Sequence, residues 1–194
     1  MDGETVLGIL EQGGKLKLTF RHCFFEGGRR ESVADHTFRL AFFALILRSE
    51  EAFKDVDMDK VIRMCLIHDL GESFTGDIPS FEKTDAETEK EDRTLDEWVS
   101  SFPPELREDF QSLLYEMDGL KTKEARVYKA LDKLEALITH NESPRETWLP
   151  IEYGLQLTYG QENMEASPWF QEIRKLIDEW TLSKTNDAED RTSF

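Results

Sequence analysis

Apolar residues recur at helical spacing along most of this chain. The segments "ELREDFQSLLYEM" (105–117) and "KEARVYKALDKLEALITH" (123–140) place them three or four positions apart, as one face of an α-helix requires. Two earlier segments, which begin near residues 33 and 60, are apolar on most sides, and this predicts helices buried at the centre of the fold. Strand patterns are scarce. The pattern predicts a compact, all-α helical bundle.

Glycine, proline and capping residues set the expected ends of several helices. A short helix over residues 4–11 should end at Gly13–Gly14, and Asp59 is a candidate N-cap for the helix that contains "KVIRMCLIHDL". Pro103–Pro104 should separate the acidic helix "DAETEKEDRTLDEWVSSF" from the next one, and Pro168 lies near the first turn of the final helix. The segment "KLKLTFRHCFF" is ambiguous.

The composition is typical of a soluble globular protein. The chain has 194 residues, of which 39% are hydrophobic and 34% are charged, enough apolar residues for one core. We expect a single domain over residues 1–184, followed by a polar, flexible tail over residues 185–194.

The charge balance argues against several classes of partner. The formal net charge is −17 and the sequence pI is about 4.6. Such a surface repels the backbone of DNA and RNA and the anionic surface of membranes, so we expect no nucleic-acid partner and no membrane partner. An anionic substrate remains possible, but it needs local cations or a bound metal ion to overcome this field.

The cysteines and the N-terminus indicate a reducing compartment. Cys23 and Cys65 both have apolar neighbours and form neither a disulfide framework nor a zinc-knuckle pattern. The N-terminal segment "MDGETVLGILEQGG" is acidic and lacks the basic start and long apolar run of a signal peptide. We therefore expect a cytoplasmic protein.

A few polar groups interrupt the apolar helices. They are His36, the adjacent pair His68 and Asp69, and Asp132. Each has an ordinary explanation by itself, because a single buried polar group usually finds a hydrogen-bond partner, and Asp132 could pair with Lys129 or Lys133. Together, however, two imidazoles and two carboxylates make a mixed nitrogen and oxygen set of metal ligands.

This ligand set suits a divalent transition metal. Mn²⁺, Co²⁺, Fe²⁺, Ni²⁺ and Zn²⁺ accept imidazole and carboxylate ligands together, whereas Ca²⁺ and structural thiolate zinc do not fit. Four protein ligands leave positions open on an octahedral ion for water and a substrate oxygen. A dication there lowers the pKa of its water and neutralises phosphate charge.

The same residues carry a family resemblance. The stretches "ADH" (34–36), "HD" (68–69) and "ALDKL" (130–134) resemble the H…HD…D motif of HD-domain phosphohydrolases. The longer stretches "ESVADH", "HDLGESFTGDIPSF", "PPELREDF" and "KALDKLEALI" are similar, in order and spacing, to the 5′-deoxynucleotidase branch of that family. The resemblance covers residues from about 15 to 142. It implies an all-α HD-domain bundle, usually dimeric, that hydrolyses deoxynucleoside 5′-monophosphates with a divalent metal.

The resemblance also implies a role for each matching residue. The metal ligands would be His36, His68, Asp69 and Asp132. Glu72 and Asp77 match the acidic residues that act on water and substrate, and Asp77 could also accept a hydrogen bond from a sugar hydroxyl. Arg21 matches an arginine that orients the phosphate, with alternatives on the same segment at Lys15, Lys17, Arg29 and Arg30.

One departure and two alternatives remain open. Many relatives have a tryptophan directly after the arginine, whereas this chain has His22, a candidate substrate-binding residue that stacks less well on a base. The site could serve another HD reaction, as a phosphodiesterase or an alarmone hydrolase. It could also be a catalytically silent module that binds a nucleotide. The segment after Trp148 has no pattern that ties it to the site.

The resemblance is the main reason to expect a homodimer. Trp98, Trp169 and Trp180 are candidates for its apolar contact surface, although burial in the core would explain them equally well.

Overall fold

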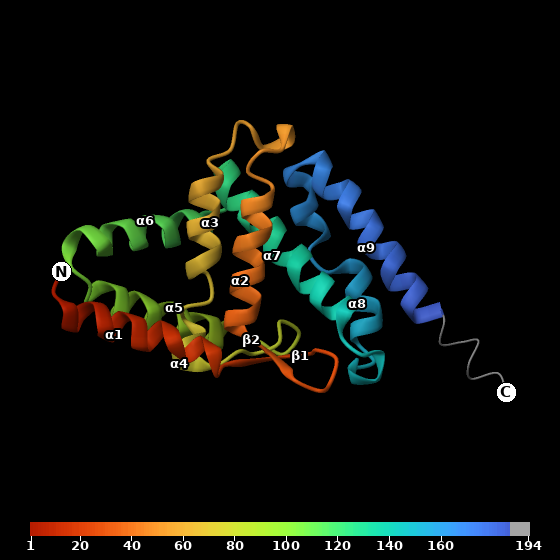
Figure 1. The fold of residues 1–194 in the computed structure, drawn as a ribbon, viewed down its shortest axis with the longest axis horizontal. Helices are drawn as coiled ribbons and strands as arrows, with labels where there is room; N and C mark the ends of the chain where they lie inside the picture. Colours follow the sequence, from red (N-terminus) through yellow and green to blue (C-terminus); the bar gives the residue numbers. More distant parts are fainter. Residues whose placement is uncertain (187–194) are drawn as a thin grey trace.

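The computed structural model describes residues 1–186 of the chain. Helices α2 (Val33–Ile46), α3 (Met58–Ile67) and α7 (Lys123–Glu142) pack against one another at its centre (Figure 1). Helix α6 (Pro104–Gly119) contacts α7 on one side, and helix α9 (Pro168–Asn186) contacts it on the other. The all-α fold class predicted from the sequence is confirmed.

The other elements surround this centre. They are α1 (Gly3–Gly14), β1 (Phe20–Phe24), β2 (Arg30–Ser32), α4 (Glu72–Thr75), α5 (Asp85–Ser100), α8 (Glu152–Thr158) and 3₁₀ turns at Lys15–Lys17, Glu51–Phe53, Arg145–Thr147 and Gln161–Ala166. Strands β1 and β2 pair antiparallel, and the segment that was ambiguous in the sequence forms a 3₁₀ turn followed by β1. Phe20 pairs with Ser32 and Phe24 with Arg30, so residues 21–23 stand opposite Glu31 alone. This bulge breaks the usual alternation of side chains along β1.

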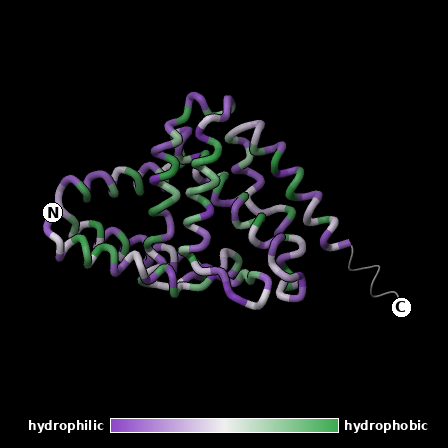
Figure 2. The backbone as a smooth tube through the Cα atoms, in the orientation of Figure 1, coloured by the Kyte–Doolittle hydropathy of each residue, from purple (hydrophilic) through white to green (hydrophobic). Residues whose placement is uncertain are grey.

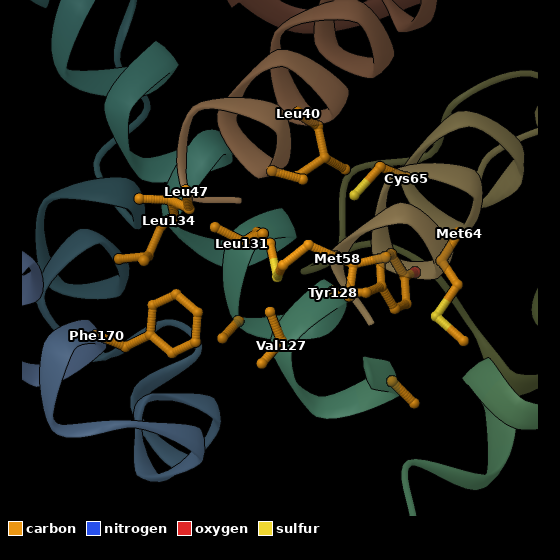
Figure 3. Close-up of a cluster of buried hydrophobic side chains, with 14 of the residues drawn as sticks. Leu40, Leu47, Met58, Met64, Cys65, Val127, Tyr128, Leu131, Leu134 and Phe170 are labelled. Atoms are coloured by element: carbon orange, nitrogen blue, oxygen red, sulfur yellow. The ribbon is translucent and has the colours of Figure 1, made fainter. Parts of the chain in front are cut away.

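The hydrophobic core lies where α2, α3, α7 and α9 meet. Leu40, Met64, Leu131 and Phe170 each come from a different one of these helices and are fully buried (Figure 3). Hydrophobic and hydrophilic residues alternate along most helices, in keeping with their amphipathic patterns (Figure 2). Each such buried side chain contributes about 1.5–3 kcal/mol relative to an exposed one, so this core fixes the relative positions of the central helices.

Capping interactions fix where the central helices begin. Ser32 Oγ accepts a hydrogen bond from the backbone N–H of Asp35 at 3.2 Å, and the Asp35 carboxylate accepts one from the backbone N–H of Ser32 at 2.9 Å. This capping box starts α2 directly ahead of His36. For α3, the expected cap Asp59 is wrong. Asp57 is the N-cap and accepts from the N–H of Lys60 at 3.0 Å, because the helix begins at Met58.

Two further boundaries differ from or extend the expectations. Helix α1 continues through Gly13 and ends at Gly14. Helix α9 includes Thr185 and Asn186, the first residues of the expected tail, and residues 187–194 lie outside the described residues. The flexible tail and the domain boundary therefore stay predictions. Within residues 1–186, every helix is too short or too polar to cross a bilayer.

Candidate metal centre

The candidate ligands come from three different helices of the central packing. His36 lies in the first turn of α2, His68 is the C-cap of α3 and Asp69 follows it, and Asp132 lies in the middle of α7. The side chains of His36 and His68 are almost completely buried, while those of Asp69 and Asp132 keep a small exposed fraction. The core contacts between α2, α3 and α7 thus bring together residues that are far apart in the sequence.

The four side chains converge on one point. The Nε2 atoms of His36 and His68 are 3.1 Å apart, and Asp69 Oδ2 lies 2.9 Å from the second and 3.7 Å from the first. One ligand atom each from His36, His68 and Asp69 fits within 4.8 Å. Asp132 falls outside that set, but its Oδ1 is 3.4 Å and 3.9 Å from the two Nε2 atoms. Ligand atoms held about 2.0–2.2 Å from one ion lie roughly 3–4 Å apart, so the arrangement fits a transition metal.

The outer nitrogens of both imidazoles are already held by acceptors. His68 Nδ1 is 2.9 Å from the carbonyl oxygen of Cys65, and His36 Nδ1 contacts the carboxylate of Glu135. Such contacts turn the Nε2 lone pairs of both rings toward a shared ion, as is usual for metal-ligating histidines.

Glu135 is buried on α7 and anchored from several directions. Its Oε1 accepts hydrogen bonds from Arg39 Nε at 2.7 Å and from Thr139 Oγ1 at 3.0 Å. Burial alone would raise the pKa of Glu135, but the neighbouring His36 and its hydrogen bond outweigh burial and lower the pKa to about 2. Burial alone would likewise lower the pKa of His36, but its carboxylate neighbours raise it to about 9. When no metal ion is bound, the extra proton on His36 supplies the positive charge that compensates the neighbouring carboxylates.

Asp132 contacts Lys129 and Lys133, the partners that its ordinary explanation suggested. It is buried, however, and does not lie on the surface. Its Oδ2 lies 3.0 Å from Lys129 Nζ and 3.6 Å from Lys133 Nζ. Burial would raise the pKa of Asp132, whereas these cations and the imidazoles hold it well below its usual range. Asp132 therefore stays ionised and can serve a metal ion with Oδ1 while Oδ2 contacts the lysines.

The two expected catalytic acids flank a turn after the HD pair. Glu72 begins α4 and is buried, so it is not a solvent-exposed loop carboxylate. Its Oε2 has no hydrogen-bond partner within residues 1–186. Burial, together with the charges of Asp69 and Asp77, raises the pKa of Glu72 to about 10. The turn itself depends on Gly71, because a Cβ there would lie 2.6 Å from Cγ of Glu91 on α5.

A cavity of about 300 Å³ opens beside the candidate ligands. Asp69 and Asp132 form part of its wall, together with Glu72 and Asp77. Arg21 also lines it and pairs with Glu31 Oε2 at 3.0 Å. The structure thus brings the sequence-predicted residues to one cavity, apart from the fully buried His36 and the nearby His68, which stand behind its wall.

His22 also lines the cavity, and it has an unexpected partner. Its Nε2 lies 2.6 Å from Oε1 of Glu152, and its ring meets the edge of Phe81 at a centroid distance of 5.7 Å. Arg29, an alternative to Arg21, pairs instead with Asp35 at 2.7 Å.

Sequence reasoning missed a second group of residues in the cavity wall. Its polar members are Lys83, Lys129, Lys133, His140, Glu152, Gln156 and Tyr159. Helical spacing could have indicated His140, since it lies two turns after Asp132 on α7. Glu152 and Tyr159 belong to the segment after Trp148, which had no recognisable pattern. Lys133 Nζ donates to Tyr159 Oη at 2.7 Å, so this segment is tied to the candidate metal centre through packing.

Residues 13–174 match the HD domain family. The chain belongs to this family. As an HD domain, it is 32% identical to a 5′-deoxynucleotidase of Dictyostelium discoideum over 141 residues, which cover 69% of this chain and 74% of the relative. It is also 30% identical to a 5′-deoxynucleotidase of Mus musculus over 144 residues, 72% of this chain and 70% of the relative. The resemblance stated from the sequence is confirmed.

Solved structures of other proteins share the fold. A structure described as a predicted metal-dependent phosphohydrolase from Magnetospirillum magnetotacticum matches with a TM-score of 0.79 and 25% identity, over 94% of this HD domain chain and 96% of the other. An HD-domain phosphohydrolase from Listeria innocua matches with a TM-score of 0.69 and 21% identity, over 92% and 90% of the two chains. The second likeness supports the fold alone.

Replacing Glu135 should weaken metal binding without removing a ligand. In Glu135→Gln, the amide cannot provide the negative charge that holds His36, so we expect metal affinity to fall about 10- to 100-fold. Titration calorimetry of metal-stripped protein with Mn²⁺ measures this. Glu142→Gln is the matched control, because Glu142 also binds Arg39 but lies at the more exposed end of that side chain. Equal affinity losses in both variants would contradict the role of Glu135.

Proposed function

We propose that this HD domain is a metal-dependent phosphomonoesterase that hydrolyses deoxynucleoside 5′-monophosphates to deoxynucleoside and phosphate. The observation that carries this proposal is the convergence of two imidazoles and two carboxylates beside a cavity lined by Glu72, Asp77 and Arg21. The similarity to 5′-deoxynucleotidases over about 70% of the chain supports the substrate class.

The proposed metal ligands are His36, His68, Asp69 and Asp132. A divalent ion such as Mn²⁺, Co²⁺, Fe²⁺, Ni²⁺ or Zn²⁺ held by these residues would supply a Lewis acid and lower the pKa of water. The fit rests on the 2.9–3.9 Å spacings of the side-chain atoms. It also rests on the acceptors that orient each imidazole, Glu135 and the carbonyl of Cys65.

Local cations explain how such an acidic protein could hold a phosphate. Arg21, Lys83, Lys129 and Lys133 all line the cavity, although the net charge of the chain is −17. We assign phosphate orientation to Arg21, whose guanidinium is held at Glu31 and is mostly buried. Its rigid fork of N–H donors suits phosphate oxygens better than a lysine ammonium does.

Glu72 is the proposed group that positions or deprotonates the attacking water. Its buried Oε2 lacks a partner within the described residues, so it can contact a water molecule in the cavity. The raised pKa of Glu72 comes from burial and from its anionic neighbours. The guanidinium of Arg21 acts in the opposite direction and favours the ionised, basic form of Glu72. Asp77 is the proposed acceptor for a sugar hydroxyl, and His22, which lines the same cavity, is a further proposed substrate-binding residue.

We further propose a homodimer formed through an apolar stripe on α2. The α2 stripe consists of Phe38, Phe42, Leu45 and Ile46, which are 50–72% exposed. The rings of Phe38 and Phe42 stack at a centroid distance of 6.3 Å. A contiguous apolar surface of this kind is typical of an interface.

The tryptophans suggested from the sequence fit this role less well. Trp98 packs on Phe102 at a ring-centroid distance of 4.7 Å, and Trp169 packs on Phe53 at 5.6 Å, so both serve the interior. Trp180 is 40% exposed on α9. The cytoplasmic location is also part of this proposal, since Cys23 and Cys65 are both buried and unoxidised.

Removing the metal should abolish phosphate release from deoxynucleoside 5′-monophosphates. The protein is stripped by chelation, metal content is measured, and phosphate release is followed after adding Mn²⁺ or Co²⁺ to a panel of nucleoside monophosphates. We expect activity only with metal and preferentially on deoxynucleotides. Full turnover by protein with no measurable metal would refute the proposal, as would hydrolysis of phosphodiesters alone.

Glu72→Gln should slow the chemical step while metal and nucleotide still bind. The expected loss is about 10²- to 10⁴-fold in single-turnover rate, the usual contribution of a general acid–base group. Metal content and nucleotide affinity are measured on the same sample. Glu91→Gln is the control, because Glu91 packs against the same turn but binds Lys83 instead. Unchanged turnover in Glu72→Gln would move the base role to Asp77, and lost metal would make Glu72 a ligand.

Charges on the α2 stripe should dissociate the dimer. In the double variant Phe38→Glu and Phe42→Glu, opposed carboxylates would meet at the two-fold interface, so we expect a monomer by sedimentation equilibrium. Leu176→Glu on α9, where the side chain is 65% exposed, should leave the dimer intact. A wild-type monomer across a wide concentration range would overturn this assignment, and so would a double variant that stays dimeric.

A further inference from the structure

Three metal-capable side chains meet at the end of the cavity away from the HD pair. His22 and Cys23 come from β1, and His140 comes from the last turn of α7. One ligand atom from each lies within 4.8 Å of the others. Cys23 Sγ is 3.5 Å from His140 Nδ1, and both residues are buried. Neighbouring residues of a regular strand point to opposite faces, but the bulge at residues 21–23 lets both side chains turn to the same side.

This cluster is separate from the candidate metal centre. His140 follows Asp132 by eight residues on α7, which corresponds to about 12 Å along the helix axis. Both positions line the same cavity, so the cluster marks the end away from the expected phosphate site.

We propose that His22, Cys23 and His140 form a second metal site, selective for a thiophilic ion such as Zn²⁺. A thiolate and two imidazoles are preferred zinc ligands, and three protein ligands leave one position for water. Zinc bonds of about 2.3 Å to sulfur and 2.0–2.1 Å to nitrogen place tetrahedral ligand atoms about 3.5 Å apart. The distance between Cys23 Sγ and His140 Nδ1 already has this value. The thiol proton leaves to water as the sulfur–metal bond forms.

Glu152 supplies the outer acceptor that such a site requires. Its Oε1 lies 2.6 Å from His22 Nε2, and its Oε2 lies 3.6 Å from His140 Nε2. His140 Nε2 and Glu152 Oε1 are both buried without a well-aligned hydrogen bond among the described residues. If the Nε2 proton of His22 is donated to Glu152, its Nδ1 lone pair is left for the ion, and His140 Nδ1 already faces Cys23 Sγ. Carboxylates commonly hold metal-ligating histidines in this way.

The surroundings argue against a nucleophilic cysteine in the same place. Burial raises the pKa of the Cys23 thiol to about 12, and burial lowers the pKa of His140 to about 4. A reactive cysteine needs the opposite, a thiolate stabilised by a protonated histidine. A neutral imidazole is, in contrast, the form that binds a metal. The indole of Trp148 covers His140 at a ring-centroid distance of 4.2 Å and limits its movement.

Occupation of this site would fill the end of the cavity that a nucleoside needs. If the proposed function holds, Zn²⁺ bound at Cys23 should compete with the nucleotide and raise the apparent KM. This consequence depends on the proposed function, whereas metal binding itself does not.

Cobalt spectroscopy tests the site directly. Co²⁺ is added to the full-length, metal-stripped protein, and the near-ultraviolet sulfur-to-cobalt charge-transfer band is recorded. The HD ligands contain no sulfur, so this band reports the second site alone. We expect the band in the wild type, its loss in Cys23→Ser, and its retention in Cys65→Ser, whose cysteine is buried elsewhere. Bound Co²⁺ should fall by one equivalent per chain in Cys23→Ser.

Displacement and a second variant complete the test. Adding Zn²⁺ to the cobalt-loaded wild type should displace Co²⁺ and abolish the band. The variant His140→Gln, which keeps Cys23, should show a weaker band or none. Circular dichroism confirms the fold of each variant. A wild-type protein without the band at saturating Co²⁺ would overturn the proposal, as would a band that persists in a folded Cys23→Ser protein. A sulfur band without any nucleotidase activity would support the second site and reject the proposed function.

Discussion

Buried charge at the junction of α2, α3 and α7 is the constraint on which the rest of the structure depends. Asp69, Asp132 and Glu135 converge on His36 in a region that the core helices largely shield from water. Carboxylates can remain ionised there only if positive charge compensates them. Protonated imidazole and lysine do so in the protein alone, and a dication would do so more completely. The lysines that flank Asp132 and the arginine that holds Glu135 therefore belong to the candidate site as much as the candidate ligands do.

The cavity extends this charge pattern from one end to the other. Near Asp69, anionic groups dominate the wall and cations such as Arg21 and Lys129 stand among them. Farther along α7, the wall includes Ala136 and Leu137, and His140 is neutral because burial lowers its pKa to about 4. A nucleoside monophosphate shows the same contrast, because its phosphate is charged and its nucleoside is much less polar. The same helix supplies residues to both ends, so their separation is fixed by its length rather than by flexible loops.

The sequence predicted the parts of the fold that local patterns encode. Helical periodicity located the central helices, and the interruptions of that periodicity located His36, the HD pair and Asp132. Local signals were less reliable for boundaries, as with the cap that is Asp57 instead of Asp59. Contacts of residues outside the ligand pattern could not be read from the sequence. Glu152 reaches the cavity only because α8 packs beside α7 and β1, and nothing near it in the sequence indicates that contact.

One face of helix α2 is committed to the three-helix junction, while the stripe that contains Phe38 and Phe42 stays exposed. His36 and Leu40 are buried, Arg39 reaches Glu135, and Asp35 caps the helix start. Substitutions on α2 therefore disturb several contacts at once. The far half of the cavity adds a bulged strand and a short helix to residues of α7. New specificities within this fold are expected to arise by drift of β1 and α8, while the three-helix junction stays as it is.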